Sequence, residues 1–218
     1  MANWRWISGA AVLLALGGCA GLSEEECAIV NWEARGQADG RLGVGPTGYT
    51  RVTRSCSKYG IAPDYAAYER GRQQGLLRFC TPDGAYLAGI QGRGSTVECA
   101  GNDPSLTRIH RTAFDYHQAK RNLNRVRNEY RRAIDSRNNA LLDIDRLRYN
   151  LRRENDQDRI NDLRRNLRFA RNRVARHAAD EARLLFLIAD YERALSSAQF
   201  QLDIMRNEFG LGYGPVRY

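Results

Sequence analysis

The sequence of 218 residues lacks a hydrophobic run long enough to cross a bilayer. Its most apolar stretch, residues 9–16, is far shorter than the ~20 residues that a membrane-spanning helix needs. Lysine is also scarce: Lys58 and Lys120 are the only two, and arginine supplies the rest of the positive charge. We therefore expect no membrane-spanning helix and a surface whose positive groups are almost all guanidinium groups.

The short apolar run at residues 9–16 has the features of an export signal. One positive charge, Arg5, precedes it, and Leu16-Gly17-Gly18-Cys19 follows it with the pattern of a bacterial lipobox. This pattern resembles that of bacterial lipoproteins, which implies removal of residues 1–18 and lipidation of Cys19. The alternative is an ordinary secretory signal that is cut nearby and leaves Cys19 as a free thiol.

The resemblance to lipoproteins also predicts where the protein is located. Several acyl chains on Cys19 make membrane attachment effectively permanent, at roughly 0.8 kcal/mol per buried CH₂. Ala20 follows the cysteine, whereas an Asp at that position often retains lipoproteins in the inner membrane. We expect a lipid-anchored protein of the outer membrane that faces the periplasm, with residues 19–26 as the lipidated N-terminus and a short linker.

The formal net charge is +9, and loss of Arg5 with the signal leaves 9 − 1 = +8. An exported protein rarely meets nucleic acid, so we expect no nucleic-acid partner. Peptidoglycan, phospholipid and lipopolysaccharide are the anionic partners available to it. A solvated helix surface, with Arg interspersed among acidic side chains, is the alternative explanation of the charge.

The sequence contains no C-x-x-C pair and no histidine cluster, which argues against zinc binding and thiol redox cycling. Four cysteines remain after the anchor, and in an oxidising compartment an even number predicts two disulfides. They lie in a small module, residues 27–103, that is too short for a large core. These residues are Cys27, Cys56, Cys80 and Cys99.

Two glycine-bearing helices are predicted inside this module. Ser23 and Glu26 fit a capping box that opens the first helix, and Asp64 starts a second helix that runs to about Phe79. Glycine inside a helix costs roughly 0.5–1 kcal/mol relative to Ala, so glycines repeated on one face predict a close contact between the helices. The residues on the two faces are Trp32, Gly36 and Gly40, and Tyr68, Gly71 and Gly75.

We expect the two helices to cross antiparallel, with Gly36 and Gly40 on Gly75 and Gly71. That register brings Cys27 close to Cys80 and leaves Cys56 for Cys99. Pairing of sequence neighbours, Cys27 with Cys56 and Cys80 with Cys99, is about equally compatible with the sequence.

Many of these positions together resemble a family of bacterial lipoproteins. The resemblance covers residues 24–100 and rests on positions that match in order: Cys27, Trp32, Gly36-x-x-Asp39-Gly40, Cys56-x-Lys58-x-Gly60, Pro63-Asp64, Tyr68-x-x-Gly71-x-x-x-Gly75-Leu76, Cys80, Gly89-x-x-Gly92 and Cys99. The family is known only as domain of unknown function 2799. The resemblance implies small envelope lipoproteins with the four-cysteine module and supplies no catalytic residues.

From Ser105 to Phe209 the sequence contains no Gly and no Pro. Apolar residues step by three and four through two arms of similar length, with a polar turn at about 154–158, so an antiparallel coiled-coil hairpin is predicted. One uninterrupted helix is the alternative. The predicted fold class is all-α: a disulfide-stapled, glycine-rich helical module, then a coiled-coil hairpin at 104–209 and a tail at 210–218.

The second arm carries more apolar surface than one partner helix covers. Leu184, Leu185, Phe186, Leu187 and Ile188 form a run that is wider than a two-helix contact needs, so we predict an interaction surface there. This run is expected to meet a second copy of the chain, the four-cysteine module or a helix of another envelope protein, and we predict self-association.

Polar residues also occur at inward-facing positions of the arms. Arg137, His177 and Glu181 are interpreted as residues that set the register or extend to water, rather than as ligands.

Several short motifs match catalytic patterns but lack the required context. Gly43-Val44-Gly45-Pro46-Thr47-Gly48 is interpreted as a loop, and Ser55-Cys56-Ser57-Lys58 lacks the partner motifs of penicillin-binding enzymes. His110 and His117 share a helix face, but no acidic residue completes a metal site. Carboxylates at 39, 64, 69 and 83 lie in a module that offers little room for a sugar-binding cleft. We expect no catalytic residues, no metal and no cofactor.

These observations predict a non-catalytic outer-membrane lipoprotein with a structural or adaptor role, in which the coiled coil binds protein. The alternative is a binder of anionic envelope polymers, peptidoglycan or lipopolysaccharide, through Arg-rich helix faces, because the forked guanidinium suits such anions.

Overall fold

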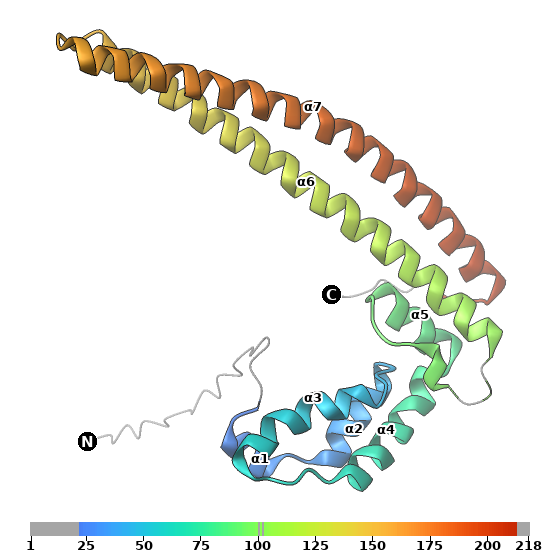
Figure 1. The fold of residues 1–218 in the computed structure, drawn as a ribbon. Coiled ribbons are helices and arrows are strands. Elements are labelled where there is room, and N and C mark those ends of the chain that lie inside the picture. Colours follow the sequence, from blue (N-terminus) through green and yellow to red (C-terminus); the bar gives the residue numbers. More distant parts are fainter. Residues whose placement is uncertain (1–21, 100, 102, 213–218) are drawn as a thin grey trace, which may run out of the picture.

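The computed structural model describes residues 22–99, 101 and 103–212, and every regular element among them is helical (Figure 1). The all-α fold with two disulfides and two long, mutually packed helices confirms the predicted fold class. The elements are α1 (Glu24–Ile29), α2 (Trp32–Arg41), α3 (Thr47–Cys56), η1 (Ser57–Tyr59), α4 (Tyr65–Phe79), α5 (Pro82–Ile90), η2 (Thr96–Glu98), α6 (Pro104–Leu151) and α7 (Gln157–Glu208).

The predicted first helix is divided into two, α1 and α2. Its capping box is present, because the Glu26 backbone N–H donates to the Ser23 hydroxyl and Glu26 accepts from the Ser23 backbone N–H. The helix nevertheless stops at Ile29, and Asn31 caps a new one by accepting a hydrogen bond from the Ala34 backbone N–H at 2.9 Å. Apolar periodicity alone predicted one continuous helix, but Asn31 is a second N-cap residue and starts a separate helix.

The backbones of α2 and α4 are in direct contact at their glycines. A Cβ on Gly36 would lie 1.9 Å from the Tyr68 carbonyl oxygen, and a Cβ on Gly71 would lie 1.9 Å from the Glu33 carbonyl oxygen. Gly40 likewise faces Gly75. The predicted glycine contact is thus present, but the predicted antiparallel register is wrong, because early residues of α2 meet early residues of α4 and the helices run parallel.

The parallel crossing accompanies disulfides between sequence neighbours. Cys27 is bonded to Cys56, which joins α1 to α3, and Cys80 is bonded to Cys99, which joins the end of α4 to the segment before α6. Of the two pairings left open by the sequence, the structure contains this one. All four cysteines are at least partly buried, so the bonds lie inside the module.

Two helices, α3 and α5, were not predicted from the sequence. Helix α5 begins with Thr81 as N-cap and Pro82 in its first turn, which is a recognisable start signal. The apolar residues of α5 follow no clear helical period. The residues that face α6 are Ala and Gly, which are weak hydrophobic signals in a sequence. A Cβ on Gly89 would lie 2.5 Å from the His110 carbonyl oxygen, so glycine permits α5 to lie directly on α6.

Helices α6 and α7 form the predicted antiparallel hairpin. Asp103 caps α6, and Glu154 closes the turn by accepting hydrogen bonds from the backbone N–H groups of Asn155 and Asp156, each at 3.0 Å. With 48 and 52 residues, the arms extend over about 70 Å at 1.5 Å per residue. Both bow gently, and α7 follows the outer side of the bow (Figure 1).

One hydrophobic core joins the module to the proximal end of the hairpin. It contains residues from the end of α4, from α5, from the start of α6 and from the end of α7. The first turns of α6 therefore complete the core of the module, and the hairpin is fixed to it by both arms. The buried members are Leu76, Phe79, Ala85, Ala88, Ile90, Cys99, Leu106, Ile109, Ala113, Leu202, Met205 and Leu211.

The crossing of α2 and α4 predicts a large effect of one added methyl group. In Gly71→Ala the new Cβ meets the Glu33 carbonyl oxygen, so the helices must separate and the free energy of unfolding should fall by about 2 kcal/mol or more. Gly212→Ala is the control, since nothing lies within 4 Å of its Cβ. Urea denaturation followed by circular dichroism measures both, and equal stability of the two variants would contradict the contact.

Candidate functional site

The predicted lipidation site, Cys19, lies outside the residues that the structure describes. Within residues 22–99, 101 and 103–212, no helix is both long and apolar enough to cross a membrane. The candidate sites in the described part are a buried polar network in the module, the distal turn of the hairpin, and the exposed surface of α7.

The α2–α4 crossing encloses a buried tyrosine–carboxylate pair. The Tyr68 hydroxyl donates to Asp39 Oδ2 at 2.9 Å, and Arg35 Nε lies 3.6 Å from the same oxygen. Burial, with the hydrogen bond to Asp39, raises the pKa of Tyr68 well above its ordinary value. Trp32 instead packs edge-on against Tyr49 of α3, at 6.1 Å between ring centroids, so this predicted helix-packing residue lies beside the crossing.

A buried arginine forms the second half of this network. Arg72 donates to both carboxylate oxygens of Glu69, each at 2.8 Å, and to Glu98 Oε2 at 2.9 Å. The hydrogen bond with Arg72 lowers the pKa of Glu69, and the bond with Glu69 raises that of Arg72. Glu98 belongs to η2, beside the Cys80–Cys99 disulfide, so the network ties α4 to that segment.

Three of the remaining candidates, Asp64, His110 and His117, have contacts that account for their positions, whereas Asp83 is exposed. Asp64 caps α4 by accepting from the Ala67 backbone N–H at 2.9 Å. His110 Nε2 lies 2.7 Å from the Arg93 carbonyl oxygen, and His117 Nδ1 lies 2.8 Å from the Ile90 carbonyl oxygen. Both histidines therefore hold the end of α5 on α6, and among the described residues no group of three or more metal-ligating side chains is present.

The inward-facing polar residues of the hairpin form an ion pair between the arms. Arg137 Nη1 lies 2.8 Å from Glu181 Oε2, and the Glu181 side chain is buried. A charged pair between apolar layers disfavours shifted alignments of the arms, because any slip would leave a buried carboxylate without its guanidinium.

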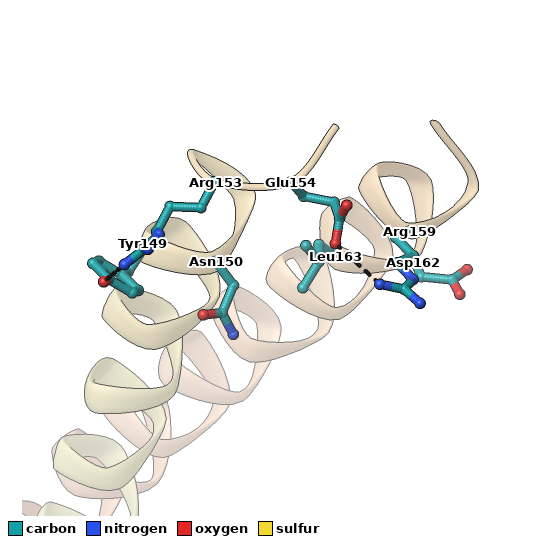
Figure 2. Close-up of a pocket in the computed structure, with 7 residues that line it drawn as sticks. All are labelled: Tyr149, Asn150, Arg153, Glu154, Arg159, Asp162 and Leu163. Atoms are coloured by element: carbon teal, nitrogen blue, oxygen red, sulfur yellow. Dashed lines mark hydrogen bonds and ion pairs between the residues drawn. The ribbon is translucent and has the colours of Figure 1, made fainter. Parts of the chain in front are cut away.

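The distal turn of the hairpin is hollowed. An open cavity of about 510 Å³ is lined by Tyr149, Asn150, Arg153, Glu154, Arg159, Asp162 and Leu163 (Figure 2). Arg153 lies over the Tyr149 ring at 5.2 Å, and Arg159 pairs with Glu154, the residue that closes the turn. Glu154 and Arg159 thus face each other at the turn, whereas Arg153 points toward Tyr149 on its own arm (Figure 2).

The predicted interaction run, residues 184–188, is divided between two faces of α7. Leu184 is buried against α6, whereas Leu187 and Ile188 are half-buried. Leu185 and Phe186 point outward, and Phe186 is 75% exposed. Consecutive residues of a helix are 100° apart, so a five-residue apolar run cannot face one partner.

The exposed apolar surface extends along α7 as a separate stripe, which we call the outer α7 stripe. Its members step by three and four on the side opposite the buried residues of α7. Phe186 and Phe200, 75% and 63% exposed, are its large apolar residues, and Ala189, Arg193 and Ser196 lie between them. The stripe consists of Ala179, Ala182, Phe186, Ala189, Arg193, Ser196 and Phe200.

Two parts of these sites were missed in the sequence. The Arg72 network has no local signature, because Glu98 lies 26 residues from Arg72 and only the fold joins them. The outer α7 stripe does have one, a second 3–4 repeat out of phase with the first, but most of its members are Ala and Ser and it is weak as a hydrophobic signal.

Residues 31–115 match the model of a family described as protein of unknown function (DUF2799). The matched segment contains α2 to α5 and the first turns of α6, so it ends inside the shared core and leaves most of the hairpin outside. No curated protein and no solved structure matches the chain.

The Glu69–Arg72 pair predicts a stability change in acid. Because the fold lowers the pKa of Glu69 below its ordinary value of 4.5, the pair stabilises the protein above that value. This contribution is lost as the pH falls through the lowered pKa. The urea midpoint of the natural protein should therefore drop more between about pH 5 and pH 3 than that of Glu69→Gln.

Asp83→Asn is the matched control, since Asp83 is exposed and forms no ion pair within the described residues. It should retain the natural acid sensitivity. An acid dependence in Glu69→Gln as steep as in the natural protein would show that the pair does not carry the effect.

Proposed function

We propose that this chain, which over residues 31–115 matches a family of unknown function, is a non-catalytic lipoprotein of the bacterial outer membrane. Its lipid holds the N-terminus in the membrane, the disulfide-bonded module forms a base in the periplasm, and the hairpin is an arm that binds protein. The observation that carries this proposal is the core that holds a long arm to the base at both of its helices.

The lipid anchor is supported by the lipobox at residues 16–19 and by the two disulfides. Disulfides form and persist in compartments such as the periplasm. A protein that carries an export signal and two buried disulfides is suited to that compartment.

The role as an arm is supported by how the hairpin is fixed. Ile109 and Ala113 of α6, and Leu202 and Met205 of α7, are buried in the same core as α5. Arg108 also pairs with Glu208 across the two arms close to that core. Because both helices are held, the arm has a defined direction relative to the base, which an adaptor needs to present a surface at a fixed distance.

The partner that best fits the outer α7 stripe is the same stripe of a second copy. A sustained 3–4 repeat is the pattern by which helices pack on helices. Two copies anchored in one membrane have arms that run in the same direction, so identical positions meet and the interface has twofold symmetry. Phe186 and Phe200 then form its large layers, and the ion pair of Arg193 with Asp190 reduces repulsion at the central layer.

Lipidation predicts a covalent change at one residue. In cells supplied with labelled palmitate, the natural protein should incorporate the label and fractionate with the outer membrane. Cys19→Ser should keep residues 1–18 and incorporate none. Cys27→Ser is the control and should still be labelled, and labelling of Cys19→Ser would contradict the anchor.

Self-association through the outer α7 stripe predicts a specific cross-link. Ala182→Cys places a thiol on the stripe, so oxidised envelopes should contain a disulfide-linked dimer on a non-reducing gel. Ala194→Cys is the matched control, because it is also an exposed alanine of α7 but lies off the stripe.

Adding Phe186→Asp to Ala182→Cys should abolish the cross-link, because a carboxylate would then lie in the apolar layer. Cross-linking of equal yield at both cysteine positions would reflect random collision and would contradict the stripe as an interface.

A further inference from the structure

The distal part of α7 carries a stretch of arginines with no carboxylate among them. Residues 163–179 contain six arginines and no Asp or Glu, so their formal charge is 6 − 0 = +6. All six side chains are exposed. Elsewhere on the hairpin arginines commonly pair with carboxylates, as Arg127 does with Glu192 at 2.7 Å.

Exposed Asp180 follows this stretch directly and forms no ion pair within the described residues, whereas the two other carboxylates close to the stretch are engaged. Asp143 of α6 pairs with Arg173 at 2.8 Å and also with Arg146, and Asp162 pairs with Arg165. Within the described residues, the side chains of four arginines of the stretch form no ion pair or hydrogen bond. These residues are Arg164, Arg168, Arg171 and Arg176.

These arginines lie on the outer side of α7. Leu167, Ala170 and Val174 face α6, and the arginine row 164, 168 and 171 steps by four and three on another side of the helix. A neighbouring row contains Arg165, Phe169 and Arg176. We call the two rows together the distal arginine face.

An exposed aromatic ring lies within this face. Phe169 is 65% exposed and has arginines at 165, 173 and 176 along its side of the helix. Transfer of a phenyl ring out of water is favourable. Guanidinium groups that leave water need hydrogen bonds with anions to replace those they made to water. A surface that offers an array of anions above an apolar layer satisfies both requirements, and the headgroup region of an anionic bilayer is such a surface.

We propose that the distal arginine face binds the phosphate headgroups of an anionic lipid bilayer. The guanidinium groups take phosphate oxygens in forked pairs, and Phe169 enters the boundary between headgroups and acyl chains. This site goes beyond the proposed adaptor role: it uses other residues of α7 and needs neither the lipid on Cys19 nor self-association.

The test is cosedimentation of the chain from residue 20 onward, without acyl groups, with vesicles of phosphatidylglycerol and phosphatidylethanolamine. The natural chain should bind these vesicles at low salt, lose much of the binding at high salt, and not bind phosphatidylcholine vesicles. Replacing the four unpaired arginines together by Gln should lower the partition coefficient at least about tenfold. Phe169→Ala should lower it a few-fold, at low and high salt alike.

A matched variant removes the same charge from other exposed arginines of the hairpin that form no ion pair with any described residue. Arg111, Arg121, Arg132 and Arg183 replaced together by Gln should change the partition coefficient less than about twofold. Circular dichroism checks that both variants keep the helical fold.

Four results would overturn the proposal. They are equal loss in the two arginine variants, absence of binding by the natural chain, displacement from vesicles by millimolar inorganic phosphate, and tighter binding to purified peptidoglycan than to anionic vesicles. The third would assign the face to soluble phosphate, and the fourth to a carboxylate polymer.

Discussion

The core shared by α4, α5 and the two arms at the proximal end of the hairpin is the constraint on which the rest of the structure depends. Phe79, Ile109 and Met205 come from three helices that are far apart in the chain, and they are buried in one cluster. Two helices in contact only with each other would extend from the module with no fixed direction. Because the core takes residues from both arms, the hairpin is a continuation of the module, and the module is completed by the hairpin.

Local signals predicted the helices of the hairpin and the type of fold. The two arms can be predicted from Asp103-Pro104, which starts the first helix, and from the absence of Gly and Pro over about a hundred residues. The crossing of α2 and α4 was predicted only in part. The glycines indicate that two backbones approach, but a Gly-x-x-x-Gly face is the same whether its partner runs parallel or antiparallel. The relative direction of α2 and α4 depends on α3, which reverses the chain between these two helices and was not predicted.

The polar residues of the module illustrate a second limit of the sequence. Asp39 and Tyr68 were identified as residues of interest without a shared role, and the structure joins them in one buried hydrogen bond. The role of Arg72 was not predicted, because nothing in an Arg-rich sequence distinguishes one buried arginine from the exposed ones. Glu69 of the same helix and Glu98 of η2 neutralise this buried charge, and the bond with Glu98 ties α4 to η2.

The distribution of cysteine gives the two halves of the molecule different sensitivity to reductant. Both disulfides lie within residues 27–99, and no cysteine occurs in the hairpin. Under reducing conditions we expect the arms, which contain no cysteine, to remain helical. The four-cysteine module would lose the stability that its two disulfides supply.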